Sequence, residues 1–409
     1  MHDEARMRDR LLREQAGYLR EHSAFYAARL DGPVRKLADL RQVEFLTKEE
    51  LREGQNAEPP FGPHLCAPRE RLVRMHVTSG TTGDPVAIGL TRADHEANSA
   101  IGGEAFRIAG VRADDTIAHC LNYALYAGGI ADHMALEASG ATVVPVGVGQ
   151  SRRLLELIPA LRITAIFGTL SFPAYLARRA DEAAIEPRSF GLRHIVTAGE
   201  PGAGLAAVRR EIETAWAVSV RDTFGMSDVW STMAGECGEG DGMHLTCLDH
   251  AIVELVDPES GELVPFDDGA EGELVWTHLR REASPLLRYR SGDLARVWTA
   301  PCTCGRLTPR VRIDGRRDDM LRVRAVNVYP QAIGALLARH REVGRWRVVA
   351  ERDPIEPPLL VHVEAPEATD TSAIAAELHE RLGAQFQVVR LDPGTLPVAE
   401  HKTPFVERR

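Results

Sequence analysis

Lysine is scarce in this sequence. The chain has 409 residues and 49 basic side chains, of which only Lys36, Lys48 and Lys402 are lysines. Arginine is the usual cation here, so a lysine within a polar motif is informative, although an ordinary surface position is the simpler interpretation of Lys36 and Lys48. A net basic charge is also missing, because 59 acidic residues outnumber the 49 basic ones and the net charge at pH 7 is −10. That balance disfavours nucleic acids and anionic membranes as partners, since both require a basic surface.

Long hydrophobic runs and a disulfide framework are missing as well. No stretch approaches the roughly 18 apolar residues that a membrane span requires. The first residues, MHDEARMRDRLLREQ, lack the apolar segment of a signal peptide, so a cytoplasmic protein is expected. The six cysteines would stay reduced in that compartment. With 44% hydrophobic and 26% charged residues, the composition is that of an ordinary globular protein of two or three domains.

The pattern of apolar residues predicts an α/β fold. Residues 3–30 have helical spacing, and from about residue 70 short apolar strands alternate with helical segments. That alternation favours largely parallel sheets flanked by helices. After residue 250 strands dominate, and a polar, hinge-like stretch at 314–319 precedes a final α+β pattern. We therefore expect a large N-terminal domain at residues 1–315 and a small C-terminal domain at residues 316–409.

One polar loop stands out between two apolar stretches. In RMHVTSGTTGDPVAIGL, the residues from Thr78 to Asp84 are small, hydroxylated or turn-forming. Such a loop brings backbone N–H groups and hydroxyls close to an anion, most often a phosphate. It is not a Walker A element, because Pro85 and Val86 stand where Gly-Lys would be needed. A strand-like segment follows, so the loop is expected to join two strands, with a plain polar hairpin as the alternative.

Five further segments follow this loop in order along the chain. They are TAGEP at 197–201, DTFGMSD at 222–228, RYRSGDL at 288–294, GRRDDMLRVRAVNVYP at 315–330 and LPVAEHKTPFVERR at 396–409. Together with the loop, they resemble the motifs of the ANL adenylating superfamily, which includes acyl- and aryl-CoA ligases. FYAARL, FLTKEEL and PFGPHL extend the likeness to the phenylacetate-CoA ligase group and to nearly the whole chain.

This resemblance implies the ANL adenylating-enzyme fold, with a large domain of mixed and parallel sheets with flanking helices and a small mobile α+β domain. It also implies an AMP-forming ligase that uses ATP and Mg²⁺ to convert an aromatic carboxylic acid to an acyl-adenylate. The acyl group would then pass to the thiol of coenzyme A. The alternative is a stand-alone adenylation enzyme that serves a carrier-protein phosphopantetheine or a nitrogen nucleophile. A non-catalytic nucleotide-binding protein is less favoured, because it would not need the lysine of EHKTPF.

The resemblance assigns roles to individual residues. Lys402 would bridge the substrate carboxylate and the α-phosphate, as a compact charge on a flexible stem can, and Asp318 would be the hinge. Asp228 replaces a family glutamate that helps to hold Mg²⁺ or to orient the α-phosphate region, and its side chain is one methylene shorter. Asp293 would accept hydrogen bonds from the ribose hydroxyls. The other expected nucleotide-binding residues are Thr78, Ser79, Gly80, Thr81, Thr82, Gly83, Gly199, Glu200, Pro201, Phe224, Gly225, Ser227 and Arg316.

The same resemblance locates the acyl pocket and the acceptor. Tyr126 and His133 suggest a ring with a polar substituent, such as a hydroxy- or aminobenzoate, and Gly128 with Gly129 would let a flat ring lie against backbone. Tyr126 pointing into the core is the alternative. Ala325 stands where the group usually has glycine beside the pantetheine tunnel, which leaves coenzyme A and an acyl-carrier protein open as acceptors. A homodimer is also left open.

The cysteines form a candidate metal site. Cys302 and Cys304 lie in PCTCGR, and Cys237 precedes His244 in ECGEGDGMH. A structural zinc ion requires four tetrahedral cysteine or histidine ligands, and these four residues supply that number. Cys247 and His250 are possible substitutes in the set. The alternative is a group of buried, reduced side chains without metal.

Overall fold

The computed structural model describes residues 2–78, 85–200, 206–324, 326–350, 355–397 and 405–408. The chain divides into two compact units, which are described one at a time. Unit 1 comprises residues 1–114, 122–143 and 223–312, and unit 2 comprises residues 115–121, 144–222 and 313–409. These units follow spatial contacts, so the domain boundary expected at residues 315–316 stays a prediction.

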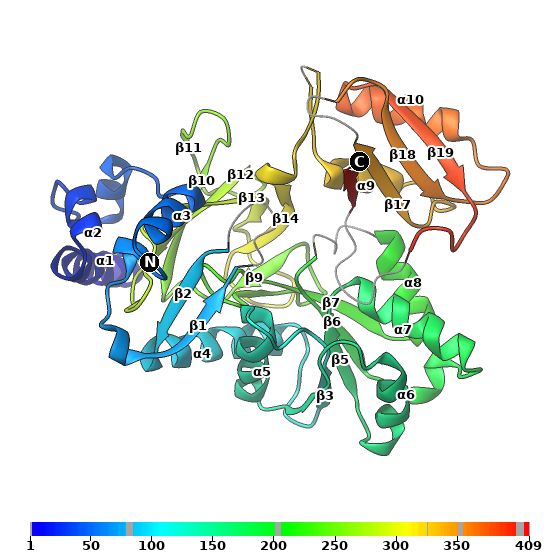
Figure 1. Cartoon of the computed structure of the whole chain (residues 1–409), viewed down its shortest axis with the longest axis horizontal. Helices are drawn as coiled ribbons and strands as arrows, with labels where there is room; N and C mark the ends of the chain where they lie inside the picture. Colours follow the sequence, from blue (N-terminus) through cyan, green and yellow to red (C-terminus); the bar gives the residue numbers. More distant parts are fainter. Residues whose placement is uncertain are drawn as a thin grey trace. The chain divides into compact units, whose positions relative to one another are not determined.

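Unit 1 combines five helices with strands that are mostly antiparallel (Figure 1). Within the described chain, its helices are α1 (His2–His22), α2 (Ala24–Arg29), α3 (Lys48–Ala57), α4 (Arg92–Ile108) and α5 (Ala127–Ser139). Its strands are β1 (Leu72–Val77), β2 (Ala87–Thr91), β8 (Ala234–Gly235), β9 (Met243–Leu245), β10 (Ala251–Val256), β11 (Leu263–Val264), β12 (Glu271–His278) and β13 (Tyr289–Trp298), with β14 (Arg310–Arg316) crossing into unit 2. The sheet order is β11-β10-β12-β13-β14-β9-β8, and β1 and β2 form a separate hairpin.

Unit 2 begins with an alternation of strands and helices. Its elements there are β3 (Thr116–His119), β4 (Thr142–Pro145), α6 (Ser151–Ala160), β5 (Ala165–Gly168), α7 (Ser171–Glu182), β6 (His194–Thr197), α8 (Ala206–Trp216) and β7 (Ser219–Phe224). Strands β3, β5, β6 and β7 pair in parallel, as the alternation predicts. β7 lies on the division between the units, because its first residues pair with β6 and its last two pair with β8.

The C-terminal part of unit 2 is a small α+β assembly. Its elements are β15 (Leu321–Val323), β16 (Val326–Val328), α9 (Pro330–Leu337), β17 (Trp346–Ala350), β18 (Leu359–Glu364), α10 (Thr371–Leu382), β19 (Phe386–Leu391) and β20 (Val406–Arg408). Four strands form a sheet in the order β19-β18-β17-β20, and α10 packs against β19. The predicted fold class is confirmed: a large mixed sheet with flanking helices, and a smaller C-terminal domain.

Local sequence signals explain where several helices begin. Thr91 caps α4, because its hydroxyl accepts from the Asp94 N–H while the Asp94 carboxylate accepts from the Thr91 N–H. Thr47 and Glu50 form the same reciprocal pair at α3. The helix expected over residues 3–30 is divided at Ser23, whose hydroxyl accepts from the Tyr26 N–H and starts α2. Within the described residues, no helix is both long and apolar enough to cross a bilayer.

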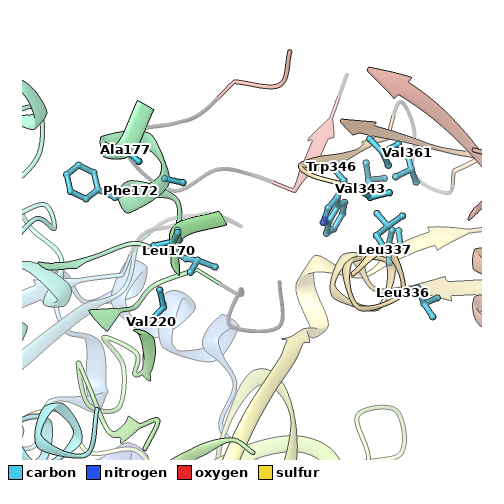
Figure 2. Packing of buried hydrophobic residues seen from close by; sticks show 14 of the residues in the cluster. Leu170, Phe172, Ala177, Val220, Leu336, Leu337, Val343, Trp346 and Val361 are labelled. Atoms are coloured by element: carbon cyan, nitrogen blue, oxygen red, sulfur yellow. The ribbon is translucent and has the colours of Figure 1, made fainter. Parts of the chain in front are cut away.

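Apolar side chains from both parts of unit 2 are buried (Figure 2). Leu170, Phe172 and Val220 come from the α7 and β7 region, where burial of apolar area stabilises the parallel strands. Leu337 of α9 and Trp346 of β17 belong to the small assembly, in which the helix covers the sheet (Figure 2).

Candidate functional site

The predicted phosphate loop leaves β1 and returns into β2. These strands are antiparallel, with Val77 opposite Ala87. Thr78 closes the neck of the loop: its N–H donates to the Val86 carbonyl at 3.0 Å, and its hydroxyl accepts from the Val86 N–H at 3.0 Å. The loop therefore joins two strands, as predicted. Ser79, Gly80, Thr81, Thr82 and Gly83 lie outside the described residues, so their phosphate contacts stay predictions.

Asp228 lies in a tight turn after β7. Gly225 permits this turn, because an added Cβ there would collide with the Ser231 backbone. The Asp228 residue is only 4% exposed. Its Oδ2 lies 3.4 Å from Lys48 Nζ, and its buried Oδ1 has no hydrogen-bond partner among the described residues. A buried carboxylate oxygen is costly without a partner, so Oδ1 is suited to accept a cation or a donor that a ligand supplies. Phe224 and Ser227, in the same segment, are half-buried.

Asp293 projects from a bulge in β13. Glu273 of β12 pairs with Leu294 and Val275 pairs with Arg290, so three residues of β13 face the single residue Leu274. Gly292 allows the bulge with a φ of +79°, and Asp293 is 3% exposed. Bulges beside active sites commonly redirect a side chain. The carboxylate predicted to hold the ribose is therefore buried at a place where the strand leaves its regular register.

The predicted nucleotide-binding segment TAGEP follows β6 in unit 2. Gly199 has a φ of +77°, which suits glycine. The Glu200 carboxylate accepts from the Ser171 N–H at 2.7 Å and from the Ser171 hydroxyl at 2.9 Å. This contact satisfies an N–H group at the first residue of α7. Glu200 thus has a structural partner, and its nucleotide contact stays a prediction. Pro201 lies outside the described residues.

The hinge and tail residues are only partly described. Arg316 ends β14, is half-buried and precedes a single 3₁₀ turn (Arg317–Asp319) that includes the backbone of Asp318. Lys402 lies outside the described residues, as does Ala325. Because Asp228 and Asp293 belong to unit 1 and Arg316 belongs to unit 2, the structure describes the two halves of the predicted nucleotide site separately.

The predicted acyl-pocket residues lie on or before α5. Tyr126 precedes the first turn and is 37% exposed, so it does not point into the core. Gly129 is packed against the backbone of Asn122 and Tyr123, where an added Cβ would collide, and Gly128 is half-buried. Gly129 thus allows two backbone segments to pack closely, and its contact with a substrate ring stays a prediction.

His133 links two polar side chains. Its Nδ1 lies 2.8 Å from the Tyr123 hydroxyl, and its Nε2 lies 3.2 Å from Glu137 Oε1. The Glu137 carboxylate accepts from the imidazole, which favours the tautomer that carries a proton on Nε2 and leaves Nδ1 as acceptor for Tyr123. Tyr123 was not predicted from the sequence, because no periodic pattern distinguishes it from the nearby Tyr126.

The structure brings the four predicted metal ligands together. One ligand atom from each of Cys237, His244, Cys302 and Cys304 lies within 4.8 Å of all the others. Sγ of Cys237 and Sγ of Cys302 are 3.7 Å apart, and Sγ of Cys304 is 3.4 Å from His244 Nε2. Tetrahedral zinc with ordinary bond lengths places two sulfurs about 3.8 Å apart and a sulfur and a nitrogen about 3.6 Å apart. The donor set therefore fits zinc in both composition and spacing.

The surroundings of this cluster orient its ligands. Thr308 accepts from His244 Nδ1 through its carbonyl at 3.1 Å and its hydroxyl at 2.9 Å, which leaves the Nε2 lone pair facing the sulfurs. Cys302 and Cys304 lie in a turn closed by the Cys302 N–H donating to the Arg306 carbonyl at 3.1 Å. Burial raises the pKa of Cys304, but hydrogen bonds from the Arg306 backbone and its neighbours outweigh burial and lower that pKa to about 7. Thiolate is the form that binds metal.

The two substitute ligands lie elsewhere. Cys247 is fully buried, and burial raises the pKa of its thiol to about 12. His250 packs edge-on against the Trp230 ring, with ring centroids 5.9 Å apart. Neither belongs to the cluster found among the described residues, so the structure does not bring either substitute to the four predicted ligands.

Lys48 lies beside Asp228, and sequence reasoning did not assign it to the predicted site. It was interpreted as an ordinary surface lysine, yet its side chain is 25% exposed and lies against Asp228, 180 residues away in the chain. Two signals were present: the scarcity of lysine, and the position of Lys48 within FLTKEEL, one of the motifs that carry the family resemblance. Neither signal indicates which residue Lys48 contacts.

Comparisons with known families agree with the motif order. A family model described as AMP-binding enzyme matches residues 21–278, and one described as AMP-binding enzyme C-terminal domain matches residues 325–408. Phenylacetate-coenzyme A ligase of Thermus thermophilus is 33% identical, with 96% of this chain and 94% of that protein covered. The phenylacetate-coenzyme A ligase of Escherichia coli (strain K12) is 32% identical, with 90% and 85% covered.

Solved structures extend the likeness to three dimensions. A 2-hydroxyisobutyryl-CoA ligase in the postadenylation state, in complex with 2-HIB-AMP, has a TM-score of 0.88 and 30% identity, with 98% of this chain and 89% of that chain covered. ATP-bound MatB from Rhodopseudomonas palustris has a TM-score of 0.58 at 19% identity, with 85% and 68% covered. The second likeness shows the fold alone.

Proposed function

Because this chain belongs to the AMP-binding enzyme family, we propose that it activates an aromatic carboxylic acid with ATP and transfers the acyl group to the thiol of coenzyme A. The near full-length likeness to phenylacetate-coenzyme A ligases supports the reaction type and the substrate class. The observation that carries the proposal in the site itself is the buried Asp228, whose Oδ1 has no hydrogen-bond partner within the described chain.

The proposed reaction has two steps. In the first, a carboxylate oxygen of the acid bonds to the α-phosphorus of ATP, the bond from that phosphorus to the β-phosphate oxygen breaks, and pyrophosphate leaves. In the second, the thiol sulfur of coenzyme A attacks the acyl carbon, loses its proton and expels AMP. Charge gathers on the phosphates during the first step, so stabilisation by positioned cations and N–H groups is expected to dominate catalysis.

Each site residue has a proposed part in these steps. Asp293 accepts hydrogen bonds from the ribose hydroxyls and so fixes the nucleotide, since one carboxylate can accept two such bonds. Lys402 contacts the carboxylate and the α-phosphate in the first step. Asp228 has the oxygen donors that Mg²⁺ prefers, and the ion would neutralise phosphate charge. Asp318 is the proposed hinge about which the small domain rotates between the two steps.

The test is a substrate screen that reads pyrophosphate release. The panel contains phenylacetate, benzoate, hydroxy- and aminobenzoates and, because a structural relative is a 2-hydroxyisobutyryl-CoA ligase, 2-hydroxyisobutyrate. We expect release with at least one aromatic acid, and faster turnover with coenzyme A present. No release with any acid would contradict the proposal. Release that an acyl-carrier protein accelerates and coenzyme A does not would favour the alternative acceptor, and a mass measurement in solution would test the homodimer.

A structural zinc ion is the second part of the proposal. Cys237, His244, Cys302 and Cys304 supply four ligands and leave no position for water, which is typical of structural rather than catalytic zinc. The ion would tie the turn at 302–306 to strand β9 and to the segment that follows β8. Elemental analysis of protein purified without chelator should find close to one zinc per chain, and less than about half an equivalent would contradict the assignment.

A further inference from the structure

Lys48 and Asp228 form a largely buried ion pair beside the proposed nucleotide site. The lysine Nζ lies 3.4 Å from Asp228 Oδ2, with side-chain exposures of 25% and 6%. The ammonium group has three N–H donors, and within the described chain only one of them has a hydrogen-bond acceptor. Both partners thus retain unused bonding capacity where they meet, which a purely structural ion pair does not require.

The backbone at Lys48 is held firmly against β13. Leu46 is fully buried; its N–H donates to the Arg288 carbonyl at 3.0 Å and its carbonyl accepts from the Arg290 N–H at 2.9 Å. Lys48 follows directly as the first residue of α3, after the Thr47 cap. The strand that anchors this segment is the one that bends to present Asp293. The lysine head group is therefore placed by a fixed backbone and not by a mobile loop.

The same helix also holds the hairpin that carries the phosphate loop. Gln55, near the end of α3, accepts from the Ala87 N–H at 2.8 Å and donates to the Ala87 carbonyl at 2.8 Å. Helix α3 thus contacts the base of β2 at one end and Asp228 at the other. Three parts of the predicted site, namely the loop hairpin, the Asp228 turn and the Asp293 strand, are bound to one short helix.

The hairpin itself supplies no cation at the end of the loop. Val86 stands where a Walker A element would have its lysine, and it is 0% exposed, in the core. Polyphosphate binding nevertheless needs positive charge, since the leaving pyrophosphate gathers negative charge in the transition state. Lys48 is a compact charge on a flexible stem, which can move between two acceptors that lie close together.

We propose that Lys48 is the cation that contacts the β- and γ-phosphates of ATP, and that it pairs with Asp228 when no nucleotide is bound. This inference rests on the proposed function. Transfer of the ammonium to the phosphates would release Asp228 Oδ2 to join Oδ1 in binding Mg²⁺. Lys48 would therefore supply the positive charge that a lysine at the end of the loop supplies in a Walker A element.

Nucleotide binding tests the proposal without reference to the acid. The variants are Lys48→Met, which keeps the stem and removes the charge, and Lys48→Arg, which keeps the charge. Lys36→Met serves as the matched control at an exposed lysine of the same unit. Calorimetric titrations with Mg·ATP and with AMP should show that Lys48→Met weakens ATP binding by about tenfold or more and leaves AMP binding within about twofold. Lys48→Arg should recover part of the ATP affinity.

Half-reactions separate this role from a structural one. Lys48→Met should lower kcat/KM for ATP in pyrophosphate release by about 10², and should convert a synthetic acyl-adenylate to thioester at a rate within about threefold of wild type. Equal losses for ATP and AMP, or ATP binding like that of Lys36→Met, would overturn the inference while leaving the proposed function intact. Wild-type protein that binds no ATP would overturn both.

Discussion

Two polar clusters in unit 1 differ in how many of their ligand and hydrogen-bonding atoms have partners. The Cys237, His244, Cys302 and Cys304 cluster is closed: its ligand atoms face one another, and Thr308 occupies the other nitrogen of the histidine. The Lys48–Asp228 pair is open, because Asp228 Oδ1 is buried without a hydrogen-bond partner among the described residues. A closed set of ligands is suited to holding a fold together, whereas an open set can accept a substrate.

A substitution in the cysteine cluster should have the largest effect, and that effect should be a loss of stability. Cys302→Ser removes a thiolate ligand, so zinc should be lost and Tm should fall by about 10 °C or more. Zinc content and thermal unfolding of the same preparation measure the two effects together. Cys247→Ser is the matched control, because that thiol lies outside the cluster, and it should keep its zinc. Normal zinc content in Cys302→Ser would show that the ligand set is wrong.

The next effect should be on the rate of the proposed reaction. Lys402→Ala removes the charge proposed to bridge the carboxylate and the α-phosphate, so acyl-adenylate formation should fall by a factor of roughly 10² or more. Conversion of a synthetic acyl-adenylate to thioester should continue, because pyrophosphate has already left. Single-turnover assays of both half-reactions make the measurement. Equal loss in both would mean that the tail serves structure and not catalysis.

The smallest effect concerns a buried carboxyl group on α5. Burial raises the pKa of Asp132 to about 7, although the Thr232 hydroxyl donates to it at 2.9 Å. A pKa that is higher in the folded state favours the protonated form, so this contribution to stability is present at low pH and is lost as pH rises towards 7. From about pH 5 to pH 8, wild type should lose on the order of 3 kcal/mol relative to Asp132→Asn.

Denaturant unfolding of both proteins across that pH range measures this difference. The variant keeps the size of the side chain and can still accept from Thr232, so the comparison isolates the ionisation of Asp132. A constant difference in the free energy of unfolding from pH 5 to pH 8 would contradict a raised pKa at this position.

Local signals predicted much of the fold. The capping boxes at Thr47 and Thr91 fix where α3 and α4 begin, because the bonds that define them join residues three positions apart. The alternation of apolar strands and helices predicted the parallel strands of unit 2, because a helix is the usual connection between two neighbouring parallel strands. The closed cysteine cluster could also be predicted from the sequence, since close spacing and ligand chemistry restrict the choice of metal ligands.

Contacts between distant segments could not be predicted from the sequence in the same way. The Lys48–Asp228 pair depends on how Leu46 docks on β13, and nothing in FLTKEEL specifies that register. The bulge that turns Asp293 out of register arises from pairing with β12, which residues 288–294 alone do not determine. The family resemblance supplied the role of Asp293, but not the reason why its strand bends there.

The most direct test of the open and closed clusters compares Asp228→Asn with Cys302→Ser in one set of measurements. Tm is recorded for each variant, and acyl-adenylate formation is measured at a temperature below the Tm of both variants. Asp228→Asn should lose about 10²-fold or more in rate with Tm within about 3 °C of wild type, and Cys302→Ser should lose Tm and zinc with a rate within about threefold. The account would be contradicted if Asp228→Asn kept its rate, or if Cys302→Ser lost rate while keeping its zinc and Tm.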